Sequence, residues 1–112
     1  MTKNLTMSML LDFYGQLLTD KQRDTVEMYY NEDLSLAEIA AETGISRQGV
    51  RDSIKRGEKL LSEYEEKLGL AQRFTQIRAR IERMDEIIDE LAGEHEKAKL
   101  LRALADEVLN EL

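Results

Sequence analysis

The sequence of 112 residues contains no cysteine, no proline and no tryptophan, and it has a single histidine. Without cysteine the chain has no disulfide, zinc ribbon or thiol nucleophile, and a reducing cytoplasm is the compartment that we expect. Without proline, no helix meets the ring and the missing N–H that break helices. No apolar run approaches the ~20 residues that span a bilayer, so we expect no membrane partner. Hydrophobic residues nevertheless make up 42% of the chain, enough for a compact core.

The residue types that usually perform catalysis are few and scattered. His95 stands between two glutamates in a predicted turn, where a histidine is typically solvated. Glu82, Glu86 and Glu90 share one helix face at four-residue spacing, a pattern typical of a hydrated surface. The six glycines are dispersed, so no glycine-rich phosphate loop exists. We therefore expect no enzyme: no catalytic residues, no metal site and no cofactor.

The N-terminal part of the chain carries the signals of four helices. Apolar residues recur every three or four positions over residues 7–18, which predicts an amphipathic helix. Capping boxes at Thr19 and Ser35 predict the starts of a second and a third helix. Gly44 is expected to end the third helix in the left-handed conformation, and Ser46 to cap a fourth that continues to about Leu68.

After Gly69 the pattern becomes that of a helical hairpin. Spacings of three and four over residues 71–92 predict a helix with an a/d stripe. Gly93 is expected to end it, and a short connection over 93–95 would make the last helix, from about Glu96, run antiparallel. We thus expect an all-α fold: a helix-turn-helix domain over 1–70, followed by a long helix and an acidic hairpin over 71–112.

The apolar stripes of this C-terminal region are broader than one short hairpin can bury. Closed two-fold dimers are the commonest way to cover such stripes, so we expect a homodimer. The choice between a hairpin and a long intermolecular coil stays open. The residues expected at the dimer contact are Phe74, Ile77, Ile81, Met84, Ile88, Leu91, Leu101, Leu104 and Val108.

Residues 35–61 have the design of a helix-turn-helix motif. Ala40 is small where the second helix crosses, Gly44 makes the turn, and Val50 and Ile54 face inward. The outward face of the second helix would then meet base edges and phosphates. The residues expected to bind nucleic acid are Ser46, Arg47, Gln48, Arg51, Asp52, Lys55, Arg56 and Lys59.

Charge gives two interpretations of this helix. Residues 46–59 hold five basic and two acidic residues, whereas the whole chain has a net charge of −7. The cations form either an anion-binding surface or a solvated face that pairs with acids of the C-terminal helices. Residues 1–70 still carry a net charge of −4, which repels phosphate and favours weak or conditional binding. The acidic C-terminal helices could instead meet a basic protein surface.

Several short stretches resemble known proteins. Region 4 of bacterial sigma factors, the helix-turn-helix that reads the promoter −35 element, is similar to LTDKQR at 18–23, YY at 29–30, SLAEIA at 35–40 and GIS at 44–46. The whole chain resembles the YlxM family of small bacterial proteins, through YGQLLT at 14–19, DLSL at 33–36, SRQGV at 46–50 and KLL at 59–61. Thr43 departs from the sigma pattern, which usually places Leu there and packs the turn more tightly.

The resemblance to the YlxM family implies a role in the signal recognition particle (SRP) pathway, because members are encoded beside its GTPase and are thought to assist or regulate it. The implied partners are the SRP GTPase or the SRP RNA. Two alternatives remain: a transcription regulator that binds duplex DNA through residues 46–59, and a purely structural dimer whose helix-turn-helix touches nothing.

Overall fold

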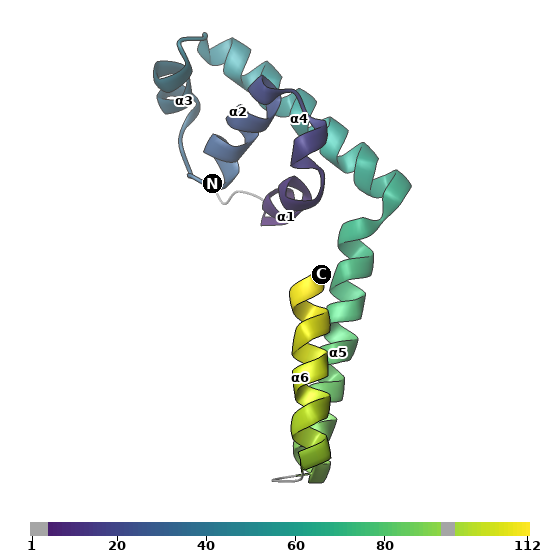
Figure 1. The fold of residues 1–112 in the computed structure, drawn as a ribbon. Coiled ribbons are helices and arrows are strands. Elements are labelled where there is room, and N and C mark those ends of the chain that lie inside the picture. Colours follow the sequence, from purple (N-terminus) through teal and green to yellow (C-terminus); the bar gives the residue numbers. More distant parts are fainter. Residues whose placement is uncertain (1–4, 93–95) are drawn as a thin grey trace. The chain divides into compact units, whose positions relative to one another are not determined.

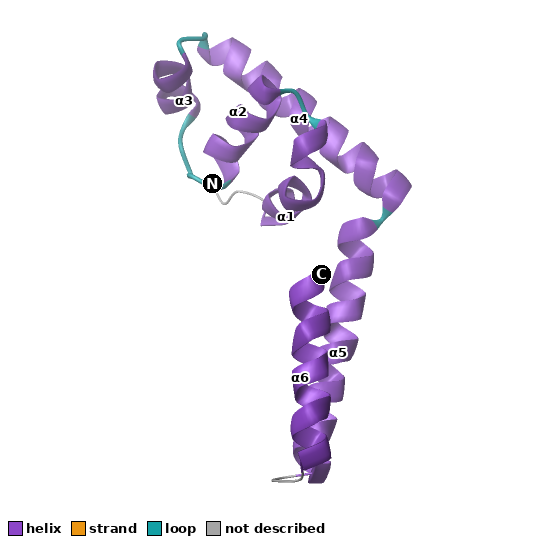
Figure 2. Ribbon diagram, viewed as in Figure 1, coloured by secondary structure: helices purple, strands orange, loops and turns teal. Residues whose placement is uncertain are grey.

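The computed structural model describes residues 5–92 and 96–112. This part of the chain is all-α, as predicted, and contains no strand (Figure 2). The chain divides into two compact units, Met1–Ala71 and Gln72–Leu112, which we call the helix-turn-helix unit and the hairpin unit. The helices are α1 (Leu5–Tyr14), a 3-10 helix (Gly15–Leu17), α2 (Asp20–Tyr30), α3 (Leu36–Thr43), α4 (Arg47–Leu68), α5 (Leu70–Ala92) and α6 (Glu96–Glu111) (Figure 1).

The first helix is shorter than the sequence predicts. The α-helical hydrogen-bond pattern ends at Tyr14, and residues 15–17 form one 3-10 turn before Leu18 becomes extended. A glycine inside an α-helix costs about 1 kcal/mol relative to alanine, so Gly15 weakens a continuous helix at this point. The extended Leu18 then leads into the cap of α2.

The predicted caps of the helix-turn-helix unit are confirmed. Thr19 and Ser35 each form a full capping box, with the hydroxyl accepting from the N3 backbone N–H and the N3 side chain accepting in return. Gly44 adopts the left-handed conformation with φ 75°, and the Ser46 hydroxyl accepts from the Gly49 N–H at 3.0 Å. The turn between α3 and α4 is thus set by local chemistry.

Two apolar clusters form the core of the helix-turn-helix unit. The first gathers α1, α2 and α4 around Tyr14, Val26 and Leu61. The second joins α3 to α4 through Ile39 and Val50. All five side chains are essentially inaccessible to solvent. The length of α4 lets one helix supply both clusters, so α4 is the element on which the others pack.

A polar cluster ties α1 and α4 to the first residues of α5. The Tyr14 hydroxyl donates to Glu65 Oε1 at 2.6 Å and accepts from the Leu70 N–H at 3.0 Å. The Ala71 N–H donates to the same Glu65 oxygen at 3.0 Å. The first N–H groups of a helix have no partner within it, and these two are satisfied by side chains from other helices.

In the hairpin unit, α5 and α6 lie side by side and run antiparallel (Figure 1). Asp89 of α5 and Arg102 of α6 form an ion pair between the two helices. Ile81 and Ala98 are the buried apolar residues of this unit among those described. The predicted break at Gly93 and the predicted turn around His95 lie outside the described residues.

A candidate nucleic-acid interface on α4

The inward side of α4 is held by close packing against α2. A Cβ atom built on Gly57 would lie 2.6 Å from Val26 Cγ2, nearer than real Cβ atoms approach. The Thr25 and Ser53 hydroxyls, both buried, lie 2.8 Å apart, and Thr25 donates to the Lys21 carbonyl at 2.9 Å. Apolar contact and a buried hydrogen bond therefore fix the rotation of α4 about its own axis.

The outward side of α4 is the face for which the sequence predicts nucleic-acid binding. Its polar residues are all exposed: Ser46, Arg47, Gln48, Arg51, Asp52, Lys55, Arg56 and Lys59. Ser46 is engaged as the helix cap. The structure thus brings the predicted site residues together along one ridge, which we call the α4 ridge.

Four of the five cations on the α4 ridge, Arg47, Arg51, Lys55 and Arg56, form no ion pair with any residue that the structure describes. The exception is Lys59, whose Nζ lies 4.0 Å from Glu63 Oε1. Asp52 accepts a hydrogen bond from Gln48 at 3.0 Å instead of neutralising Arg56. The ridge residues therefore comprise five cations and one carboxylate, a net positive charge on a chain that is acidic as a whole.

The second carboxylate of this part of α4 belongs to Glu58, which lies beside the ridge and is half-buried. The Tyr30 hydroxyl donates to Glu58 Oε1 at 2.8 Å. Burial, reinforced by this hydrogen bond and by the charge of Glu58, raises the pKa of Tyr30. This hydrogen bond gives Glu58 no cationic partner, and Glu58 lines a hollow beside Arg51 and Lys55. Asp52 is the one carboxylate among the ridge residues themselves.

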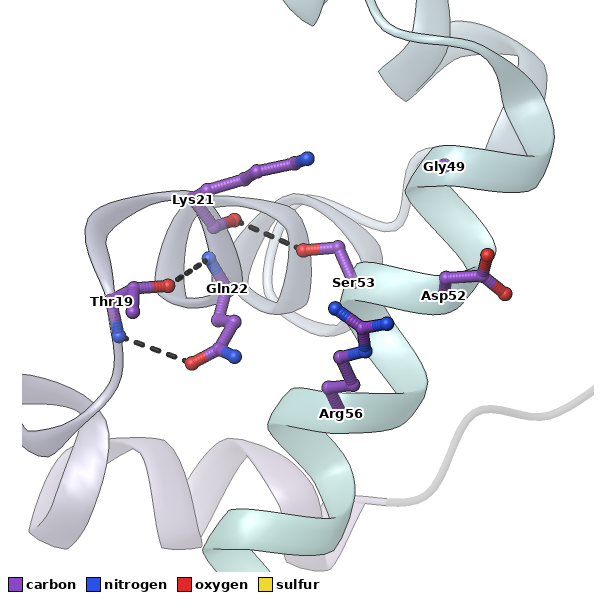
Figure 3. Close-up of a pocket in the computed structure, with 7 residues that line it drawn as sticks. All are labelled: Thr19, Lys21, Gln22, Gly49, Asp52, Ser53 and Arg56. Carbon is purple, nitrogen blue, oxygen red and sulfur yellow. Dashed lines mark hydrogen bonds between the residues drawn. The ribbon is translucent and has the colours of Figure 1, made fainter.

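Two hollows flank the α4 ridge within the helix-turn-helix unit. The larger, of about 300 Å³, lies between α4 and the first turn of α2 and is lined by Thr19, Lys21, Gln22, Gly49, Asp52, Ser53 and Arg56. Figure 3 shows the side chains that line it, with Ser53, Asp52 and Arg56 on α4 and Lys21 and Gln22 on α2. The smaller, of about 160 Å³, is lined by Tyr29, Leu36, Arg51, Ile54, Lys55 and Glu58. The lining of the larger hollow thus includes one ridge cation, Arg56, and that of the smaller includes two, Arg51 and Lys55.

Lys21 is a residue that the sequence does not point to. It lies in the first turn of α2, 35 positions before Arg56, yet both line the larger hollow. No spacing rule relates the two, because the hollow exists only once α2 packs on α4. The local sequence shows only that Lys21 lies just inside a capping box, next to Asp20, and this does not indicate a hollow.

The predicted dimerisation residues lie on α5 and α6. Ile81 is buried, and Phe74, Ile77 and Ile88 are half-buried. The remaining five are exposed: Met84, Leu91, Leu101, Leu104 and Val108. The two stripes therefore leave large apolar side chains uncovered in the single chain.

The described residues include no group of three or more His, Cys, Asp or Glu that could hold a metal ion. Glu82 and Glu86, two of the aligned acids, pair with Arg78 and Arg83. Nor does any described helix combine the length and the apolar composition needed to cross a bilayer.

Comparison with known proteins agrees with this geometry. Residues 1–104 match the model of the UPF0122 family, described as "Putative helix-turn-helix protein, YlxM / p13 like". The chain belongs to this family. UPF0122 proteins similar to it include one of Thermoanaerobacter sp. (strain X514), 47% identical over 107 residues, which are 93% of this chain and 92% of the relative. The UPF0122 protein of Halalkalibacterium halodurans is 46% identical over 102 residues, 91% of this chain and 94% of the relative.

A UPF0122 protein of Clostridium kluyveri is similar over its whole length, with 42% identity over 112 residues and 100% of both chains covered. The family match confirms the resemblance to YlxM that the sequence stretches indicate. It also fits the helix-turn-helix geometry of α3 and α4.

Proposed function

We propose that this UPF0122 protein is a non-enzymatic regulatory protein that binds nucleic acid through the α4 ridge. The observation that carries the proposal is the exposed set of cations without ion-pair partners on a helix that follows a helix-turn. An α-helix with its side chains is about 10–12 Å across, and the major groove of B-form DNA is about 12 Å wide. Duplex DNA is therefore the nucleic acid that the geometry favours.

In this arrangement the two flanking hollows would take the two phosphate strands that border the groove. Lys21 and Arg56 serve the larger hollow, and Arg51 and Lys55 serve the smaller. Gln48, near the start of α4, is positioned to reach base edges, as residues at the start of a recognition helix do. Cations that contact phosphates displace counterions from the nucleic acid, so the affinity should fall as the salt concentration rises. The net charge of −7 opposes the binding itself.

A fluorescence anisotropy titration with labelled duplex DNA at low and moderate salt tests the proposal. We expect Lys55→Ala to weaken binding several-fold and to reduce the salt slope by about 1, the value for one lost phosphate contact. Arg51→Ala should act in the same direction. The matched control is Lys67→Ala, which removes an exposed cation from the last turn of the same helix. The proposal would be contradicted if Lys55→Ala and Arg51→Ala left the affinity unchanged. It would also be contradicted if Lys67→Ala lowered the affinity as much as they do.

A role in the SRP pathway is the second candidate, and the resemblance to the YlxM family supports it. Its partners would be the SRP RNA or the SRP GTPase. The major groove of A-form RNA is too deep and narrow to admit side chains, so the α4 ridge would contact RNA through phosphates and unpaired bases. The same titration with SRP RNA, and sedimentation with the purified GTPase, separates the candidates. If the protein binds neither the SRP RNA nor the GTPase, the SRP proposal is wrong. The duplex-DNA proposal is tested separately by the titration with duplex DNA.

A further inference from the structure

The hairpin unit has an apolar groove of about 240 Å³ on the face formed by α5 and α6. It is lined by Ile81, Met84, Ile88, Leu101, Leu104, Ala105 and Val108. Met84 is 56% exposed and Leu104 48% exposed, although both are large and apolar. An apolar surface shared by two helices and bordered by charged residues is typical of a protein contact.

The charges of the hairpin unit follow the same order along both helices. Residues 70–81 hold three arginines and no carboxylate, whereas residues 82–92 hold five carboxylates and one arginine. Residues 96–103 hold three basic residues and one acid, whereas residues 104–111 hold three acids and no basic residue. The helix dipole favours the opposite order, with acids first and cations last, so the order does not serve the stability of each helix.

This charge order places basic halves beside acidic halves whenever two of these helices run antiparallel. Within the hairpin, the acidic half of α5 lies beside the basic half of α6, as the ion pair between Asp89 and Arg102 shows. When two such hairpins pair about a two-fold axis parallel to their helices, with α6 of each copy beside α5 of the other, every helix has only antiparallel neighbours. The same order then matches opposite charges across the contact as well. A uniformly basic or uniformly acidic partner would be repelled by half of the surface, whereas a second copy is not.

Two charged residues at the rim of the groove indicate how the helices of the two copies would be placed against each other. Arg80 precedes Ile81, and Glu107 precedes Val108, so each occupies the position before a core position of its heptad. Neither side chain has a hydrogen bond or an ion pair with any residue that the structure describes, and both are exposed. By contrast, Arg78 and Arg83 are paired within α5.

We propose that the groove is covered by the hairpin unit of a second copy of this chain, seated with its α6 on α5. Arg80 of each copy then pairs with Glu107 of the other, and the two apolar grooves close on each other as the core of a four-helix bundle. Such flanking pairs set partner choice and orientation, while the apolar core supplies most of the affinity. This proposal is independent of nucleic-acid binding.

Sedimentation equilibrium of the full chain over a wide range of concentration tests the contact. We expect a dimer, and we expect Leu104→Asp to convert it to a monomer, because a charge would enter the closed core unpaired. Leu104 is half-exposed in the single hairpin, so the helicity of that variant, measured by far-UV circular dichroism, should stay close to that of the parent chain. A chain that sediments at the mass of one copy at every concentration would overturn the proposal and would leave the groove to a different protein.

A charge exchange tests the orientation. Glu107→Arg should raise the dissociation constant of the dimer about tenfold by setting like charges opposite each other. Adding Arg80→Glu should restore most of the loss, because the pair is re-formed in reverse. Asp106→Arg makes the same charge change one position earlier, away from the rim, and serves as the matched control. Equal weakening by Glu107→Arg and Asp106→Arg, or no recovery in the double variant, would overturn the arrangement.

Discussion

The two units of this chain use apolar side chains in opposite ways. In the helix-turn-helix unit, Val26, Ile39 and Leu61 are sealed from solvent by four helices. In the hairpin unit, two helices leave Leu91 83% exposed and Leu101 52% exposed. The two units have similar apolar content, yet their apolar side chains differ in exposure, because a face is buried only when enough neighbouring helices are present to cover it.

The first prediction uses the same substitution in both units. Leu61→Ala should lower the free energy of unfolding by about 2–5 kcal/mol, because it opens a cavity in a closed core. Leu104→Ala should cost much less at concentrations where the chain is monomeric, since that side chain remains half in water. Urea unfolding followed by circular dichroism at low concentration measures both. Equal losses of unfolding free energy in the two variants would contradict the difference in burial between the units.

The second prediction concerns the closest approach of two helices in the helix-turn-helix unit. Gly57→Ala should destabilise the protein by about 1–3 kcal/mol through overpacking, less the gain of about 1 kcal/mol that alanine brings to a helix. Val26 is a short, branched and fully buried side chain, so it has little room to move away. Ala79→Gly, at an exposed position of α5, is a control that should cost only the helix propensity. A stabilising effect of Gly57→Ala in thermal unfolding would show that α2 and α4 can separate freely.

The third and smallest prediction concerns alkaline pH. Burial, together with hydrogen bonds to Glu65 and Glu58, raises the pKa of Tyr14 and of Tyr30 above the ordinary value of 10.0. The unfolded chain then loses these protons at lower pH than the folded chain. Stability is therefore fully present below pH 10 and falls as the pH rises above it.

Residues 72–112 contain no tyrosine, so this loss should appear in the helix-turn-helix unit and not in the hairpin unit. Urea unfolding from neutral pH to about pH 11 measures it, and Tyr30→Phe should make the decline shallower. An unchanged decline in Tyr30→Phe would contradict the role of that hydroxyl.

Local chemistry made much of the fold predictable from sequence. Thr19, Ser35, Gly44 and Ser46 each determine a helix end through their own side chain or backbone freedom, and all four act as predicted. The 3–4 spacing likewise placed the start of α5 within one residue. Signals of this kind involve residues only a few positions apart, so a single sequence contains them in full.

Features that join distant residues could not be predicted in the same way. Lys21 enters the larger hollow only because α2 packs on α4 there. The hydrogen bond between Thr25 and Ser53 joins residues 28 positions apart, and both would pass for ordinary helical polar residues. The residues of the α4 ridge could be predicted because helical periodicity places them on one face. The hollows beside the ridge could not, because they depend on how separate helices pack.

The polar cluster around Tyr14 determines where the chain can be cut for work on isolated fragments. A fragment that stops at the end of α4 would lose the two amide groups that Tyr14 and Glu65 bind, and would leave a phenol and a carboxylate without these partners. An N-terminal fragment should therefore extend at least through Ala71. A C-terminal fragment that starts at Gln72 begins inside the first turn of a helix and needs a new cap, such as an added serine, to replace what it loses.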